Sequence, residues 1–172
     1  MNLLNSIRFT WDLRGLVLPD SQLQEHYELG NAAAEEEKEV QKVISSSFAL
    51  DSVWNGDIQE IDRLVETWFE VAFKGDTNIC VVLRHGLRII GAAILAPDPN
   101  AENHLAPGPC ILPEYRNRGF GTHLLGYSLL TLRNAGCAQA VTLAKENTPA
   151  AKFLYTKFNG VASPDISPLP AV

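Results

Sequence analysis

The residues with the most suggestive chemistry lie in positions 111–122, which read ILPEYRNRGFGT. This stretch predicts the end of a strand, a turn and the first turn of a helix. A helix start offers unpaired N–H groups and the positive end of the helix dipole, and Gly119 and Gly121 let the backbone approach an anion closely. Arg116 and Arg118 add cationic donors for phosphate oxygens. The pattern therefore favours binding of a phosphate or pyrophosphate group.

Two common phosphate-binding motifs are excluded at this turn. The dinucleotide motif GxGxxG requires a third glycine where Leu124 stands, and the string GxxxxGK[ST] does not occur in the chain. Taken alone, two glycines between a strand and a helix are also ordinary turn residues. The motifs on either side decide between these interpretations.

In its order of motifs the chain resembles the GNAT superfamily of N-acetyltransferases. Arg116–Gly121 is similar to the family's coenzyme A motif [Q/R]-x-x-G-x-[G/A], and Gly91 is similar to the glycine of its third strand. The family's N-x-x-A…Y helix is resembled by Asn147, Ala150 and Tyr155. The resemblance covers roughly residues 57–160.

The resemblance implies a mixed α/β (α+β) fold with a mostly antiparallel central sheet flanked by helices, here with shortened C-terminal strands. It also implies acetyl-CoA as cosubstrate and no metal, with the pyrophosphate on the glycine turn and the pantetheine arm along a strand that splays from its neighbour. The residues implied in cofactor binding are Ile111, Leu112, Arg116, Asn117, Arg118, Gly119, Phe120, Gly121, Thr122 and Asn147.

Catalysis by this resemblance is direct attack of an amine on the thioester, with Tyr155 as the acid that protonates the leaving thiolate. Eight residues separate Asn147 from Tyr155 where the family more often has seven, a difference of about 100° on a helix. A core aromatic is the competing interpretation of Tyr155. His104 is a candidate base because histidine titrates near neutral pH, although it could also be an ordinary loop residue. Cys110 is better explained as a buried strand cysteine than as a nucleophile.

The predicted function is transfer of acetyl from acetyl-CoA to a primary amine of a small molecule or peptide in a ternary complex. The alternative is a non-catalytic acyl-CoA sensor or interaction module. A formal charge of −6, with no run of Lys or Arg longer than two, argues against nucleic acid as a partner. It weakly favours a cationic acceptor.

Length and composition predict one domain over residues 1–172, with a cofactor-binding core at about 78–160. Three cysteines without a CxxC pair indicate a reduced, cytoplasmic setting. The chain has no apolar run of about 20 residues and no signal-peptide pattern at its start, so no membrane association is expected.

The expected elements follow from periodicity and from capping residues. A helix over 31–48 is expected to be capped by Asn31, and a second helix to begin at Asp57 and stop at Gly75. Further along, the sequence predicts a hairpin of residues 78–84 and 88–96, a strand near 110–112, a helix over 121–134 and a strand over 140–144. A last helix is expected to be capped by Thr148 and to end just before Gly160.

Both ends of the chain are harder to assign. A strand is possible at Ile7–Trp11, but the first 30 residues otherwise show no clear pattern. The tail 161–172 is short and contains three prolines, so it can supply one irregular strand at most. Three outcomes are open for the sheet edge: it stays bare, the N-terminal 30 residues cover it, or a second subunit does so in a homodimer.

Overall fold

The computed structural model describes residues 6–49, 77–146 and 148–164, together with residues 59, 62–63, 65–67 and 69–70. The strands are Ser6–Asp12 (β1), Tyr27–Asn31 (β2), Ile79–His85 (β3), Arg88–Leu95 (β4), Cys110–Ile111 (β5), Gln139–Lys145 (β6) and Val161–Pro164 (β7). The helices are Glu37–Ala49 (α1) and Phe120–Asn134 (α3), and the short turns are Leu13–Gly15 (η2), Ala34–Glu36 (η3), Pro113–Tyr115 (η4), Ala150–Leu154 (η5, a π-helical turn) and Lys157–Asn159 (η6). Within these ranges no helix is long and apolar enough to cross a bilayer.

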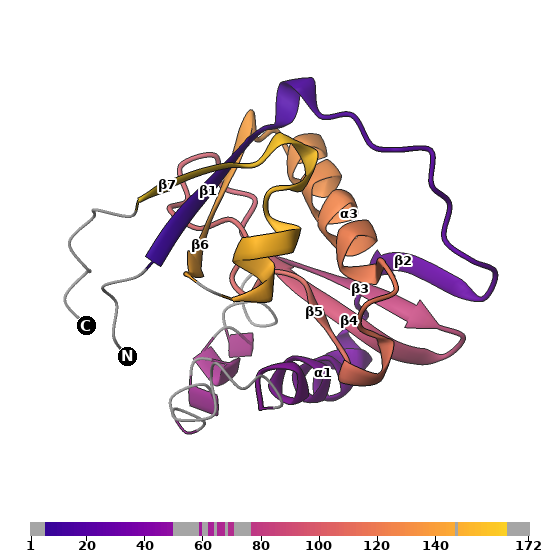
Figure 1. The fold of residues 1–172 in the computed structure, drawn as a ribbon. Coiled ribbons are helices and arrows are strands. Elements are labelled where there is room, and N and C mark those ends of the chain that lie inside the picture. The colour runs from indigo at the N-terminus through magenta and orange to yellow at the C-terminus, as the bar shows by residue number, and fades with distance from the viewer. Residues whose placement is uncertain are drawn as a thin grey trace.

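The strands form two antiparallel sheets, ordered β2-β3-β4-β5 and β6-β1-β7. Helices α1 and α3 lie on opposite sides of the larger sheet (Figure 1). Strand β4 is buried from its second residue onward because it is covered on both faces. The predicted α+β fold is confirmed, including the hairpin, the helix after the glycine turn and the strand that follows it.

The first predicted helix begins later than expected. Asn31 is the last residue of β2, and the cap is Ala33, whose N–H donates to the Glu36 carboxylate at 2.8 Å. Strand β2 was not predicted because its burial does not alternate strictly: Tyr27, Leu29 and Gly30 are half-buried while Glu28 and Asn31 are exposed. Helix α1 then follows the predicted apolar face, which buries Val40, Val43 and Ile44.

The other two predicted helices differ in how far the structure describes them. The cap Asp57 and the stop Gly75 of the second helix lie outside the described residues, whereas the described residues between them are helical and bury Val65 and Phe69. The last predicted helix is broken: η5 is followed by the separate turn η6, where Phe158 has a φ of 57°.

The first 30 residues supply the strand that covers the sheet edge. Strand β1 pairs with β6 over its whole length, from Ser6 opposite Lys145 to Asp12 opposite Gln139. Its other side pairs with β7, the one strand that the proline-rich tail contributes to the described part of the chain. The N-terminal segment, which lies more than 120 residues from β6 in sequence, therefore completes this sheet (Figure 1).

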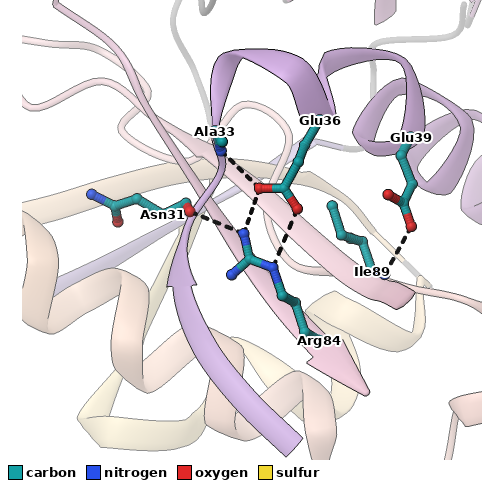
Figure 2. A network of polar contacts seen from close by, with 6 residues as sticks. All are labelled: Asn31, Ala33, Glu36, Glu39, Arg84 and Ile89. Atoms are coloured by element: carbon teal, nitrogen blue, oxygen red, sulfur yellow. Dashed lines mark hydrogen bonds and ion pairs between the residues drawn. The ribbon is translucent and has the colours of Figure 1, made fainter. Parts of the chain in front are cut away.

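Two glutamates fasten α1 to the β3–β4 hairpin (Figure 2). The β3–β4 register shifts just before Arg84, and the N–H of Ile89 donates instead to the Glu39 carboxylate at 3.0 Å. Arg84 pairs with Glu36 and also donates to the carbonyl of Asn31 at 3.2 Å. The start of α1 is thereby held against the sheet on the face opposite α3.

Candidate active site

The glycine turn forms a nest of unpaired backbone donors. Asn117 and Gly119 have positive φ values of 62° and 82°, between residues with negative φ, and this alternation turns successive N–H groups toward one concavity. Among the described residues, no N–H group from Asn117 to Thr122 has a hydrogen-bond partner, and the first one used in α3 is that of His123, which donates to Gly119. The turn can therefore surround an anion with backbone donors.

Among the residues that the structure describes, strand β5 leaves the N–H group of Ile111 without a partner. The N–H of Leu112 donates to the carbonyl of Ile90 on β4 at 2.9 Å, so the alternation of a strand turns the N–H and carbonyl of Ile111 away from β4. The carbonyl of Leu112 accepts from Tyr115. Of the two residues predicted to bond the cofactor arm, only Ile111 has its backbone directed to the open edge.

The two predicted arginines occupy different positions. Arg116 is half-buried and its guanidinium donates to Ile111 O at 3.2 Å and to Ser47 O at 2.8 Å. Arg118 is exposed on the nest, with its guanidinium carbon 5.6 Å from the ring centre of Tyr115. Arg118 is thus exposed to solvent at the nest, whereas Arg116 is engaged with the protein.

His104 joins the two sheets where they meet. Its backbone N–H donates to the carbonyl of Val141 at 2.7 Å, and its ring nitrogen Nδ1 accepts from the backbone N–H of Val141 at 3.0 Å. This leaves the proton on Nε2, which donates to the Asp98 carbonyl at 2.9 Å. With 1% exposure and both ring nitrogens occupied, His104 has a structural position, and its contacts do not support the predicted role as base.

Tyr155 lies between β5 and β6, which are edge strands of the two different sheets. We call the space between these two strands the fork. An added Cβ on Gly108 would overlap its hydroxyl and come within 3.1 Å of the adjacent ring carbon, so the hydroxyl rests against the chain that leads into β5. Burial raises the pKa of Tyr155, the nearby Cys110 adds to this effect, and Thr142 on β6 opposes it. The side chain is 6% exposed and its phenol stays protonated near neutral pH.

The unusual spacing before Tyr155 is matched by the wide turn η5. The N–H of Tyr155 donates to the carbonyl of Ala150, five residues earlier, at 2.9 Å. A π-helical turn holds one residue more than an α-helical turn, so it absorbs the extra residue noted in the sequence. The companion residue of that motif, Asn147, lies outside the described residues.

Cys110 is buried in the fork near Tyr155. Burial raises the pKa of its thiol to about 12, and its Sγ donates to the Gly108 carbonyl at 3.3 Å. A thiol in this state is a poor nucleophile near neutral pH.

Two residues at the site, Ser47 and Gly108, are not among the predicted site residues. Gly108 is marked only by the prolines on both sides, and nothing near Ser47 points to its contact with Arg116, 69 residues away. Across the described part of the chain, His, Cys, Asp and Glu side chains form no group of three or more that could hold a metal ion.

Comparison with known proteins assigns the class. Residues 43–160 match the model of the acetyltransferase (GNAT) family, which is well over half of the chain. This chain therefore belongs to the GNAT acetyltransferase family. No protein of curated function matches it in sequence.

Solved structures share the fold at low identity. A GCN5-related N-acetyltransferase from Ralstonia eutropha is 16% identical with a TM-score of 0.58, over 85% of this chain and 98% of that one. A GNAT family acetyltransferase from Brucella melitensis, in complex with acetyl-CoA, is 21% identical with a TM-score of 0.52, over 66% and 73%. A Drosophila protein is 14% identical with a TM-score of 0.58, over 92% and 48%. This chain thus spans about half the length of the Drosophila protein.

Proposed function

We propose that this chain transfers an acetyl group from acetyl-CoA to a primary amine of a small molecule or peptide, by direct attack within a ternary complex. The observation that carries the proposal is the run of unpaired N–H groups from Asn117 to Thr122, with the free N–H of Ile111 and the hydroxyl of Tyr155 beyond it. These donors follow the order of pyrophosphate, pantetheine arm and thioester along the cosubstrate. Membership of the acetyltransferase family supports the same assignment.

In this mechanism the chain binds and orients acetyl-CoA and protonates the departing sulfur. The nest receives the pyrophosphate through backbone N–H groups, and Ile111 bonds the pantetheine arm as an added strand would. Acetyl-CoA supplies the activated acetyl group. The neutral amine nitrogen forms a bond to the thioester carbonyl carbon, the carbon–sulfur bond breaks, and Tyr155 gives its proton to the departing sulfur. The nitrogen then loses one proton to solvent, and solvent returns a proton to the Tyr155 oxygen, which leaves the amide, the free CoA thiol and the original phenol. The amine must lose a proton before attack, and His104 is not assigned this step.

A direct transfer agrees with the state of Cys110. A covalent route would need a thiolate, and burial disfavours the charged form of this thiol. Cys110→Ala is therefore expected to keep turnover within about threefold of wild type. Loss of all turnover with retained CoA binding would favour a covalent route.

The test of the function is release of free CoA thiol from acetyl-CoA in the presence of amines, polyamines, amino acids and basic peptides. The expected result is thiol release that requires one of these acceptors, together with thermal stabilisation by CoA. Stabilisation without acceptor-dependent release would indicate a sensor rather than an enzyme. Absence of any stabilisation by CoA would contradict the proposal.

A further inference from the structure

The side chain of Arg116 connects strand β5, which is proposed to bind the cosubstrate, with helix α1, which is not. Its Nε donates to the carbonyl of Ile111, and one terminal nitrogen donates to both the carbonyl and the hydroxyl of Ser47, at 2.8 and 3.2 Å. Ser47 lies in the last turn of α1 and is buried. Arg116 therefore joins the open edge of β5 to the C-terminal end of α1, the helix that lies on the face of the larger sheet opposite α3.

The chemistry of both acceptors suits a guanidinium. The last turn of a helix has carbonyls without intrahelical partners and the negative end of the helix dipole, and α1 has no basic residue of its own there. A guanidinium is rigid and planar, so it can donate from Nε and from a terminal nitrogen at fixed spacing. A lysine has a single nitrogen and cannot reproduce both contacts in the same geometry.

We propose that Arg116 is a positioning residue, which clamps the carbonyl of Ile111 to the end of α1 so that the N–H of Ile111 stays directed to the pantetheine arm. This inference rests on the proposed function for its ligand. It differs from a role as phosphate ligand, the role that the sequence suggested for this cation. In the nest, Arg118 is the exposed cation.

The two roles differ in which part of the cosubstrate they affect. CoA contains the pyrophosphate and the pantetheine arm, whereas S-acetylpantetheine contains only the arm and the thioester. Arg116→Lys keeps the positive charge and removes the pair of donor nitrogens that a guanidinium holds at fixed spacing. It is expected to weaken both ligands by the same factor, about tenfold, because the strand that both would bind is no longer held. Arg133→Lys, the matched control at an arginine whose guanidinium donates to the carbonyl of Leu16 instead, is expected to change neither affinity more than about twofold.

Affinities are measured by calorimetry for CoA and by ligand-detected NMR for S-acetylpantetheine, at a temperature where each variant is folded by circular dichroism. A loss for CoA that spares S-acetylpantetheine would overturn the proposal in favour of phosphate contact. Unchanged affinities for both ligands would overturn it as well. If Arg116→Lys does not fold, Ser47→Ala removes one of the three contacts. It is expected to weaken both ligands equally, about threefold, and an unequal or absent effect contradicts the clamp.

Failure of the clamp and failure of the proposed function can be told apart. If the wild-type protein binds neither ligand, the proposed function is contradicted and the clamp is then judged on the free protein. Amide hydrogen exchange at Leu112, whose N–H donates to β4, is expected to be at least about tenfold faster in Arg116→Lys or, where that variant does not fold, measurably faster in Ser47→Ala. Equal exchange rates in variant and wild type would overturn the clamp.

Discussion

The hydroxyl of Tyr155 is held by its surroundings at one point of the fork between the sheets. Its ring packs against Phe9 and Trp11 of β1, with ring centres 5.4 and 5.7 Å away, and the absence of a side chain on Gly108 leaves room for the hydroxyl. Since burial raises its pKa, this phenol keeps its proton near neutral pH. In the proposed mechanism it donates that proton through a hydrogen bond to the departing sulfur.

Tyr155→Phe tests this role at the scale of one atom. The variant keeps the ring packing and loses the proton donor, so CoA affinity is expected to stay within about twofold while turnover falls about 100-fold. Titration of CoA and the rate of thiol release with a working acceptor give the two numbers. Unchanged turnover would remove Tyr155 from the mechanism, and Phe153→Leu, at an exposed aromatic of the same turn, serves as control.

Among the elements, the wide turn η5 accommodates the one extra residue that precedes Tyr155 and still leaves its side chain in the fork. Deleting the exposed residue Lys152 is expected to convert the wide turn to an ordinary helical turn and to return Tyr155 to the same place, because the bond from its N–H to Ala150 would then span four residues. Turnover is expected within about threefold of wild type, compared with Lys152→Ala as control. A folded deletion variant with no turnover would show that the wide turn itself is required.

The start of α1 depends on a partly buried ion pair. Arg84 lowers the pKa of Glu36 through a side-chain hydrogen bond, and the N–H of Ala33 contributes in the same direction. A lowered carboxyl pKa adds stability above the unfolded-state pKa, and this stability is lost as pH falls through the folded-state value.

Glu36→Gln is therefore expected to lower the free energy of unfolding by about 1 kcal/mol near neutral pH. The difference from wild type is expected to start shrinking below about pH 4.3, the ordinary pKa of an unfolded-state glutamate, and to disappear below the lower folded-state pKa of Glu36. Urea unfolding across this pH range measures both. Glu35→Gln, at an exposed neighbour, is the control. A difference that does not change with pH would contradict the ion-pair explanation.

Elements with a strong local period were predictable, and contacts between distant segments were not. The hairpin of β3 and β4 and the helix after the glycine turn follow from apolar runs and turn residues within each segment. The pairing of β1 with β6 depends on side chains more than 120 residues apart, for which one sequence contains no signal. The position of His104 was obscured for a related reason: its partners Val141 and Asp98 make it structural, and neither contact leaves a local pattern.

At the scale of the whole molecule, the two sheets are joined beside the fork in which Tyr155 lies. His104 and Leu105 bridge them: Leu105 pairs with β4, and its carbonyl accepts from the Thr142 hydroxyl on β6 at 3.1 Å. Beyond this junction the N–H of Ile111 on β5 has no strand partner among the described residues. The junction therefore sets where the fork begins.

His104→Ala is expected to lower the free energy of unfolding by about 2–4 kcal/mol, because it leaves the N–H of Val141 without an acceptor and opens a cavity. His104→Asn places a carbonyl oxygen near the position of Nδ1 and is expected to lose less. Denaturant unfolding of the two variants measures the difference. Equal losses would contradict the importance of the Nδ1 contact.

Backbone N–H groups of the glycine turn and of β5 are proposed to bind the cosubstrate. The most direct test of this binding is titration of the ¹⁵N-labelled protein with CoA, observing amide resonances. The largest shifts are expected on the amides of residues 117–122 and of Ile111, with smaller changes at Leu112, whose N–H is already paired with β4. Absence of shifts at saturating CoA, or shifts confined to residues outside the turn and β5, would contradict this binding.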